Sequence, residues 1–111
     1  MKYMLLIHED DAERVAMMEE RMPTCAAYVE AMQKAGIYVV GERLRAVGAT
    51  TRVSVADGAT HVIDGPYAEV KEQLGGFHLI DVPDLDTALA WAARCPSASR
   101  GRVEVRPVWP L

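Results

Sequence analysis

The sequence predicts an α+β fold in which helices cover one face of an antiparallel sheet. Two apolar runs, residues 3–7 and 77–82, have the length and composition of strands, and each is followed by acidic residues and a helical pattern. Between them, Asp57-Gly58 joins two short β-type segments and predicts a tight hairpin, because both residue types tolerate positive φ. The order strand-helix-strand-hairpin-strand-helix-strand is that of a ferredoxin-like βαββαβ-type sandwich.

The first strand is predicted over residues 2–8, with apolar side chains at successive positions, as expected when both faces of a sheet are covered. Asp10 lies three residues before Glu13 in the spacing of a capping box, which predicts a helix from about Asp11. Pro23 is well placed as the first residue of a second helical segment that runs to Ala35.

In the second half of the chain, Leu85, Ala88 and Leu89 recur at helical spacing in a segment that Pro96 ends. Residues 41–50 are expected to form an irregular polar connection. The remaining strands are predicted at residues 37–40, 52–55, 60–63, 77–82 and 103–108.

Length and composition narrow the classes of protein. With 111 residues, of which 50% are hydrophobic, residues 1–111 form one domain that buries roughly 65% of its unfolded surface. A net charge of −4 leaves no basic stripe and argues against nucleic-acid binding. No apolar run approaches the roughly 20 residues that span a bilayer, so we expect a cytoplasmic protein with no membrane contact.

No cofactor is expected from the motifs. Cys25 and Cys95 are too few for a disulfide framework, and no Cys/His spacing indicates zinc. A glycine-rich phosphate loop is also absent. By contrast, the sheet face opposite the helices has apolar residues and no third layer to cover it. We therefore predict a homodimer formed through this face.

The polar segment that follows Asp64 is the main candidate for a site, because a connection held between two strands presents its side chains on a rigid frame. Asp64 is a candidate general base, although an aspartate before Gly65-Pro66 commonly fixes a turn, and the residues favour that structural role. Tyr67 is suited to stacking on an aromatic ligand or, more commonly, to packing at a subunit interface.

Charged residues near this segment add candidate ligand contacts. Glu69 and Lys71 are suited to a polar substrate, and solvated surface charge is the ordinary alternative. Arg106 lies in the middle of the last predicted strand, where its guanidinium needs a carboxylate partner. Asp64 or a ligand acid would supply that partner, so a structural ion pair and an anion-binding role remain equal alternatives.

His8 and His78 lie at corresponding positions of the two strand-helix units. If both line a cavity of the dimer, one is a candidate general base oriented by Asp64 or Glu9. A strand histidine is more commonly a buried residue with satisfied hydrogen bonds, and this alternative stays open. A small organic ligand bound near Asp64, Tyr67, Arg106 and His8 is the function that these residues favour.

Several separated motifs resemble the YCII-related, DGPF-domain family. They are Asp64-Gly65-Pro66-Tyr67, Lys71-Glu72-Gln73-Leu74-Gly75-Gly76, Leu79-Ile80-Asp81 and Val103-Glu104-Val105-Arg106-Pro107-Val108. The resemblance covers essentially the whole chain and implies a dimeric α/β barrel of ferredoxin-like subunits. Tyr67 occupies the position of the phenylalanine in the Asp-Gly-Pro-Phe motif that gives the DGPF family its name.

The resemblance implies less about activity, since most members are uncharacterised. Some related YCII proteins are proposed to have a His-Asp site, and one branch dehalogenates chlorinated aromatics. The proposed catalytic histidine of those proteins lies in the first helical region. No histidine occurs between Asp11 and Ala35 in this sequence, so that histidine has no counterpart here. DGPF proteins often occur beside or fused to extracytoplasmic-function sigma factors, which implies an alternative function as a regulatory module with a sigma-factor partner.

Overall fold

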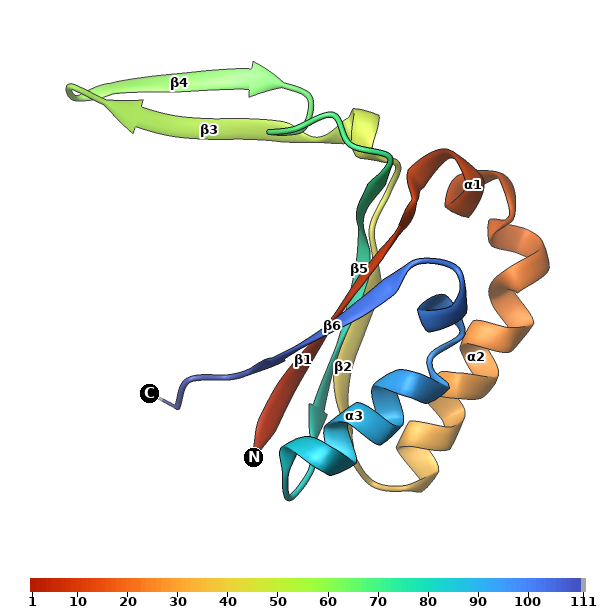
Figure 1. The fold of residues 1–111 in the computed structure, drawn as a ribbon. Helices are drawn as coiled ribbons and strands as arrows, with labels where there is room; N and C mark the ends of the chain where they lie inside the picture. The colour runs from red at the N-terminus through yellow and green to blue at the C-terminus, as the bar shows by residue number, and fades with distance from the viewer. Residues whose placement is uncertain (111) are drawn as a thin grey trace.

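The computed structural model describes residues 1–110 and has the predicted ferredoxin-like topology. Its main sheet has the strand order β2-β5-β1-β6, and all neighbouring strands are antiparallel. Figure 1 shows the helices on one side of this sheet. The strands of the sheet are β1 (Lys2–Asp10), β2 (Tyr38–Arg43), β5 (Glu72–Asp81) and β6 (Arg102–Pro107), and the helices are α1 (Asp11–Ala16), α2 (Met18–Lys34) and α3 (Leu85–Arg94).

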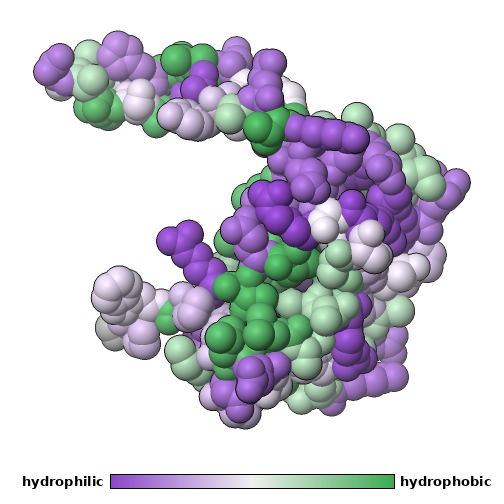
Figure 2. Space-filling view, viewed as in Figure 1, coloured by the Kyte–Doolittle hydropathy of each residue, from purple (hydrophilic) through white to green (hydrophobic). Residues whose placement is uncertain are grey.

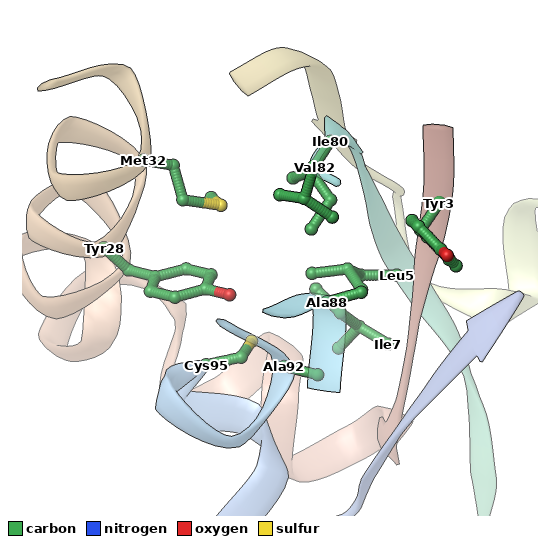
Figure 3. Packing of buried hydrophobic residues seen from close by; sticks show 10 residues of the cluster. All are labelled: Tyr3, Leu5, Ile7, Tyr28, Met32, Ile80, Val82, Ala88, Ala92 and Cys95. Atoms are coloured by element: carbon green, nitrogen blue, oxygen red, sulfur yellow. The ribbon is translucent and has the colours of Figure 1, made fainter. Parts of the chain in front are cut away.

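Strand β1 alternates strictly between the two faces of the sheet, and this alternation positions the core. Its odd-numbered residues from Tyr3 to Glu9 are buried beneath the helices, whereas the even-numbered residues from Met4 face the other side. Figure 3 shows side chains of α2, α3 and the sheet converging in the core. The buried apolar cluster consists of Tyr3, Leu5, Ile7, Tyr28, Met32, Ile80, Val82, Ala88, Ala92 and Cys95.

The start of α1 is confirmed, because the Asp10 side chain accepts a hydrogen bond of 3.0 Å from the Glu13 backbone N–H. The predicted break at Pro23 is wrong. The chain leaves helical geometry at Met17, with φ −101° and ψ 7°, and α2 begins at Met18. Pro23 lies inside α2, where its missing N–H removes the hydrogen bond to one carbonyl near the start of the helix.

Strand β5 begins five residues before the predicted start at Phe77. Of residues 73–76, interpreted from the sequence as part of a polar loop, Gln73, Leu74 and Gly76 pair with β1, and Gly76 also pairs with β2. Glycine is needed here for close approach rather than for a turn. A Cβ on Gly75 would lie 2.5 Å from Arg14 Nε, and a Cβ on Gly76 would lie 2.8 Å from the Glu42 carbonyl oxygen.

The hairpin prediction is confirmed. Strands β3 (Thr51–Ala56) and β4 (Ala59–Asp64) pair as a separate two-stranded sheet, joined by Asp57 and Gly58 at φ 50° and 74°. Positive φ at both central residues is the geometry of a type I′ turn. In Figure 1 the hairpin projects from the side of the main sheet that carries no helix. Among the described helices, none combines the length and the apolar character needed to cross a membrane.

Candidate functional site

A cavity of about 370 Å³ lies between α2 and the inner face of the main sheet. The helix side of the cavity is largely apolar, and the sheet side carries polar and charged groups. Such a combination of an apolar wall with a few polar groups is typical of small-molecule sites, and the volume lies within their usual range of roughly 300–1,000 Å³. The apolar side chains on its wall include Ile7, Met22, Ala26 and Val29.

Glu9 is a buried carboxylate on the cavity wall, with only 5% of the residue exposed. Its Oε2 accepts a hydrogen bond of 3.2 Å from the Ser97 hydroxyl, and its Oε1 has no hydrogen-bond partner. The guanidinium nitrogens of Arg21 and Arg100 lie 3.7 and 3.8 Å from Oε1. Two positive charges therefore compensate a carboxylate that still has one unused acceptor.

Arg14 of α1 is buried beside the same cavity, with 8% of the residue exposed. Its guanidinium donates hydrogen bonds to the carbonyls of Leu44 and Arg45, at 2.9 and 3.2 Å, and to Asp11 Oδ1 at 3.3 Å. Nε has no partner. Arg14 thus fastens the connection after β2 to α1, while its Nε–H is left unpaired.

His78 supplies the imidazole of the cavity. Its ring lies between those of Tyr28 and Tyr38, with centroid distances of 5.6 and 6.1 Å. Burial lowers the pKa of His78 below its ordinary value of 6.5, so the ring is neutral at physiological pH. Nδ1 is buried without a hydrogen-bond partner. A neutral imidazole both accepts and donates a proton, which is the property required of an acid-base group.

Two cysteines complete the wall of this cavity, Cys25 on α2 and Cys95 after α3. Burial raises the pKa of the Cys95 thiol, which disfavours the reactive thiolate. Among residues 1–110, no group of three or more His, Cys, Asp or Glu side chains is arranged to hold a metal ion. Hydrogen bonding and proton transfer are chemistry that the side chains of the cavity can supply.

Comparison with known protein families shows a match for the whole sequence. The sequence profile of the YCII-related domain matches residues 1–111. The chain belongs to the YCII-related family. It is also 36% identical over 114 residues to the uncharacterized protein R00369 of Rhizobium meliloti strain 1021, a match that covers 97% of this chain and 92% of the relative. The resemblance inferred from the sequence motifs is thereby confirmed.

In this YCII-related chain, the two candidate histidines lie on opposite faces of the sheet. His78 pairs in register with the inward-facing Leu5, whereas His8 belongs to the outward-facing set of β1. His8 Nε2 lies 2.7 Å from Glu104 Oε1 on that outer face. Within one chain the two histidines therefore do not line the same cavity, because strand parity separates an even-numbered residue of β1 from the core.

The other sequence-derived candidates do not line this cavity. Asp64 is exposed at the end of β4, and Tyr67 is exposed beside the hairpin, with the Arg52 guanidinium 6.0 Å from its ring centroid. Arg106 is exposed and lies opposite Met4 on the outer sheet face. An ion pair between Asp64 and Arg106, one of the two alternatives for Arg106, does not occur within the described part of this YCII-related chain.

The polar connection before β5 also lies on the surface. Lys71 Nζ is 3.7 Å from Asp10 Oδ2 in a largely exposed ion pair, and Glu69 is exposed without an ion pair among residues 1–110. Solvated charge, the ordinary alternative for both, describes their surroundings. The ligand-binding roles assigned to these residues stay predictions.

Sequence reasoning named Glu9 only as a residue that would orient a histidine, and it missed Arg14 as a cavity residue. Glu9 carries a recognisable signal, because it continues the alternation of Tyr3, Leu5 and Ile7 and so must point into the core. Its position beside two further acidic residues made a helix-capping role sufficient to explain it. Arg14 has no comparable signal, since its partners at residues 44 and 45 lie 30 and 31 positions away in the sequence.

Proposed function

We propose that this protein binds a small, largely apolar organic molecule in the cavity between α2 and the sheet. The observation that carries the proposal is the cavity of about 370 Å³, which is lined by Glu9, Arg14 and His78 together with apolar side chains, most of them on α2. The apolar wall favours an aromatic or aliphatic body. The charged groups favour a ligand that also carries a hydrogen-bonding group.

Acid-base catalysis is the chemistry that these side chains support best. His78 is the candidate proton acceptor, because its ring lies on the cavity wall, burial keeps it neutral, and its Nδ1 has no hydrogen-bond partner. Glu9 lies beside two arginines and has one carboxylate oxygen without a hydrogen-bond partner, so it is suited to orienting a donor group of the ligand. No redox cofactor is required for this chemistry.

The experiment is a thermal-shift screen of small aromatic and carboxylic compounds, followed by calorimetric titration of each hit. A ligand at 100 times its Kd adds about 2.7 kcal/mol to the free energy of unfolding. For a domain of this size that raises Tm by several degrees. His78→Phe is the test variant, and His8→Phe is its matched control because it replaces the same residue type on the opposite face.

Loss of binding in His78→Phe together with retained binding in His8→Phe supports the proposed site. Asp64→Asn tests the location that the sequence suggested. A ligand whose binding is lost in Asp64→Asn and kept in His78→Phe would move the site to the base of the hairpin. A sigma-factor partner, the alternative implied by the family resemblance, would be tested by co-purification from the native host.

We also propose that the protein is a homodimer formed through the outer face of the main sheet. This face carries the side chains opposite the helix layer, and no element among residues 1–110 covers it (Figure 1). Its central apolar residues remain partly exposed in the single chain, and a second copy would bury them. They are Met4, Leu6, Phe77 and Leu79.

A further inference from the structure

The β3–β4 hairpin, residues 51–64, is here called the arm. It forms a sheet of its own, and every strand residue except Arg52 is exposed. A two-stranded ribbon without a covering layer is at best marginally stable in water, since it buries too little apolar surface. The arm therefore has surface that is suited to contact with another molecule.

One face of the arm carries three exposed valines. Val53 pairs with Val62 across the strands, and Val55 lies two residues further along on the same face. These three valines are 63 to 69% exposed. The opposite face carries the pairs Arg52–Ile63, Ser54–His61 and Ala56–Ala59. Residues Val53, Val55 and Val62 define the valine face of the arm.

A second uncovered apolar surface lies on the same side of the molecule. The arm projects from the side of the main sheet opposite the helices (Figure 1). Figure 2 shows a hollow between the arm and the body, with hydrophobic residues gathered on the body next to it. The outer face of the main sheet contributes Met4 and Leu6 of β1 to this side.

We propose that the arm clasps a second copy of this chain, with its valine face packed against the body of the partner in a two-fold dimer. This inference rests on the homodimer proposed above. Because one chain carries both uncovered surfaces, a two-fold contact covers the arm and the sheet of each copy at once and leaves no open end.

The reach of the arm agrees with this arrangement. Each arm strand has six residues, which extend over ~20 Å, whereas two sheets packed face to face lie only ~10 Å apart. An arm that projects from the interface side must therefore pass along the body of the partner.

Charged residues on the arm and on the sheet also favour contact with a second copy of the chain. Asp64 lies on the valine face, and Arg106 lies on the outer sheet face. Neither has an ion-pair partner among residues 1–110, so each copy offers an unpaired acid on its arm and an unpaired base on its sheet.

Sedimentation equilibrium of the full chain tests the proposal. Val53→Lys with Val62→Glu removes apolar surface from the valine face while opposite charges across the strands preserve pairing. The matched control, Ser54→Lys with His61→Glu, makes the same change at the adjoining cross-strand pair on the other face. We expect the dimer Kd to rise about tenfold or more in the valine-face variant and less than about threefold in the control.

An unchanged dimer Kd in the valine-face variant would overturn the proposal. A second variant, Leu6→Asp, distinguishes the proposed role of the arm from dimer formation through the outer sheet face. If Leu6→Asp abolishes the dimer and the valine-face variant does not, the sheet-face dimer stands and the role of the arm falls. If the wild-type chain stays monomeric at every concentration measured, both the sheet-face dimer and the role of the arm are wrong.

Hydrogen exchange provides a readout that does not depend on substitutions. Amides of β3 and β4 should be protected when the protein is concentrated and should exchange faster on dilution below the dimer Kd. Arm amides that exchange equally fast at both concentrations would contradict the clasp, whereas protection of β1 and β5 should persist in either state.

Discussion

The Tyr28 hydroxyl donates a hydrogen bond of 2.6 Å to the Trp91 carbonyl and so joins α2 to α3 across 63 positions of sequence. This carbonyl lies in the last turn of α3, where helix carbonyls lack intrahelical partners. Burial raises the pKa of Tyr28, so the hydroxyl stays protonated and able to donate. One phenol thus satisfies a helix end and forms an apolar part of the cavity wall.

Tyr28→Phe should lower the free energy of unfolding by about 0.5–1.5 kcal/mol, because the ring packing is kept and a single hydrogen bond is lost. Urea unfolding followed by far-UV circular dichroism measures the change. Tyr67→Phe is a matched control, since Tyr67 is exposed and its hydroxyl makes no hydrogen bond among residues 1–110. Equal stabilities of wild type and Tyr28→Phe would show that the bond to Trp91 contributes nothing net.

The free energy of unfolding should decrease at acidic pH because of His78. The unfolded imidazole takes up a proton near its ordinary pKa of 6.5, whereas burial lowers the pKa in the folded state. The unfolded state therefore binds more protons between these two pKa values, and the free energy of unfolding decreases as pH drops below about 6.5. His78→Phe should remove this component and flatten the pH dependence.

Urea midpoints between about pH 7.5 and pH 5 for wild type and His78→Phe measure the effect. The comparison isolates His78 because all other titrating groups are common to both proteins. Identical pH profiles would contradict a depressed pKa at this position.

Gly41 should tolerate no side chain. A Cβ there would lie 2.5 Å from His78 Nδ1 and 2.8 Å from the Phe77 carbonyl oxygen, so Gly41→Ala must displace the ring or the strand. We expect a loss of about 1–3 kcal/mol in the free energy of unfolding. Gly48→Ala is the matched control, since a Cβ at Gly48 would meet nothing within 4 Å, and a neutral or slightly positive effect is expected. Equal effects at the two glycines would rule out the steric explanation.

Leu5 should be among the most sensitive core positions. Leu5 lies in the middle of β1 and is 0% exposed, so truncating its side chain would leave a void between the sheet and the helices. Leu5→Ala should cost about 2–5 kcal/mol. The same substitution at Leu89, which is 46% exposed on α3, should cost less than about 1 kcal/mol. Denaturant unfolding of both variants checks the contrast, and similar losses would show that the core is not centred on β1.

The candidate site was predictable only in part. His78 was named from the sequence, and the structure places it on the cavity, yet the expected companions Asp64 and Tyr67 lie at the hairpin. A segment rich in turn residues suggests a site because loops commonly carry function. Here that segment connects the arm to β5, and the cavity is formed by residues that the sequence pattern assigns to a strand, a helix cap and the core.

Elements that depend on neighbours a few positions away were determined by the sequence itself. The turn at Asp57 and Gly58 follows from their tolerance of positive φ, and the start of α1 follows from the Asp10 cap. Only the tertiary structure decided that β5 runs through Gly75 and that Glu9 meets Ser97, 88 positions away. Such contacts depend on how whole elements pack against one another, and a short window of sequence carries no information about the distance between residues that far apart.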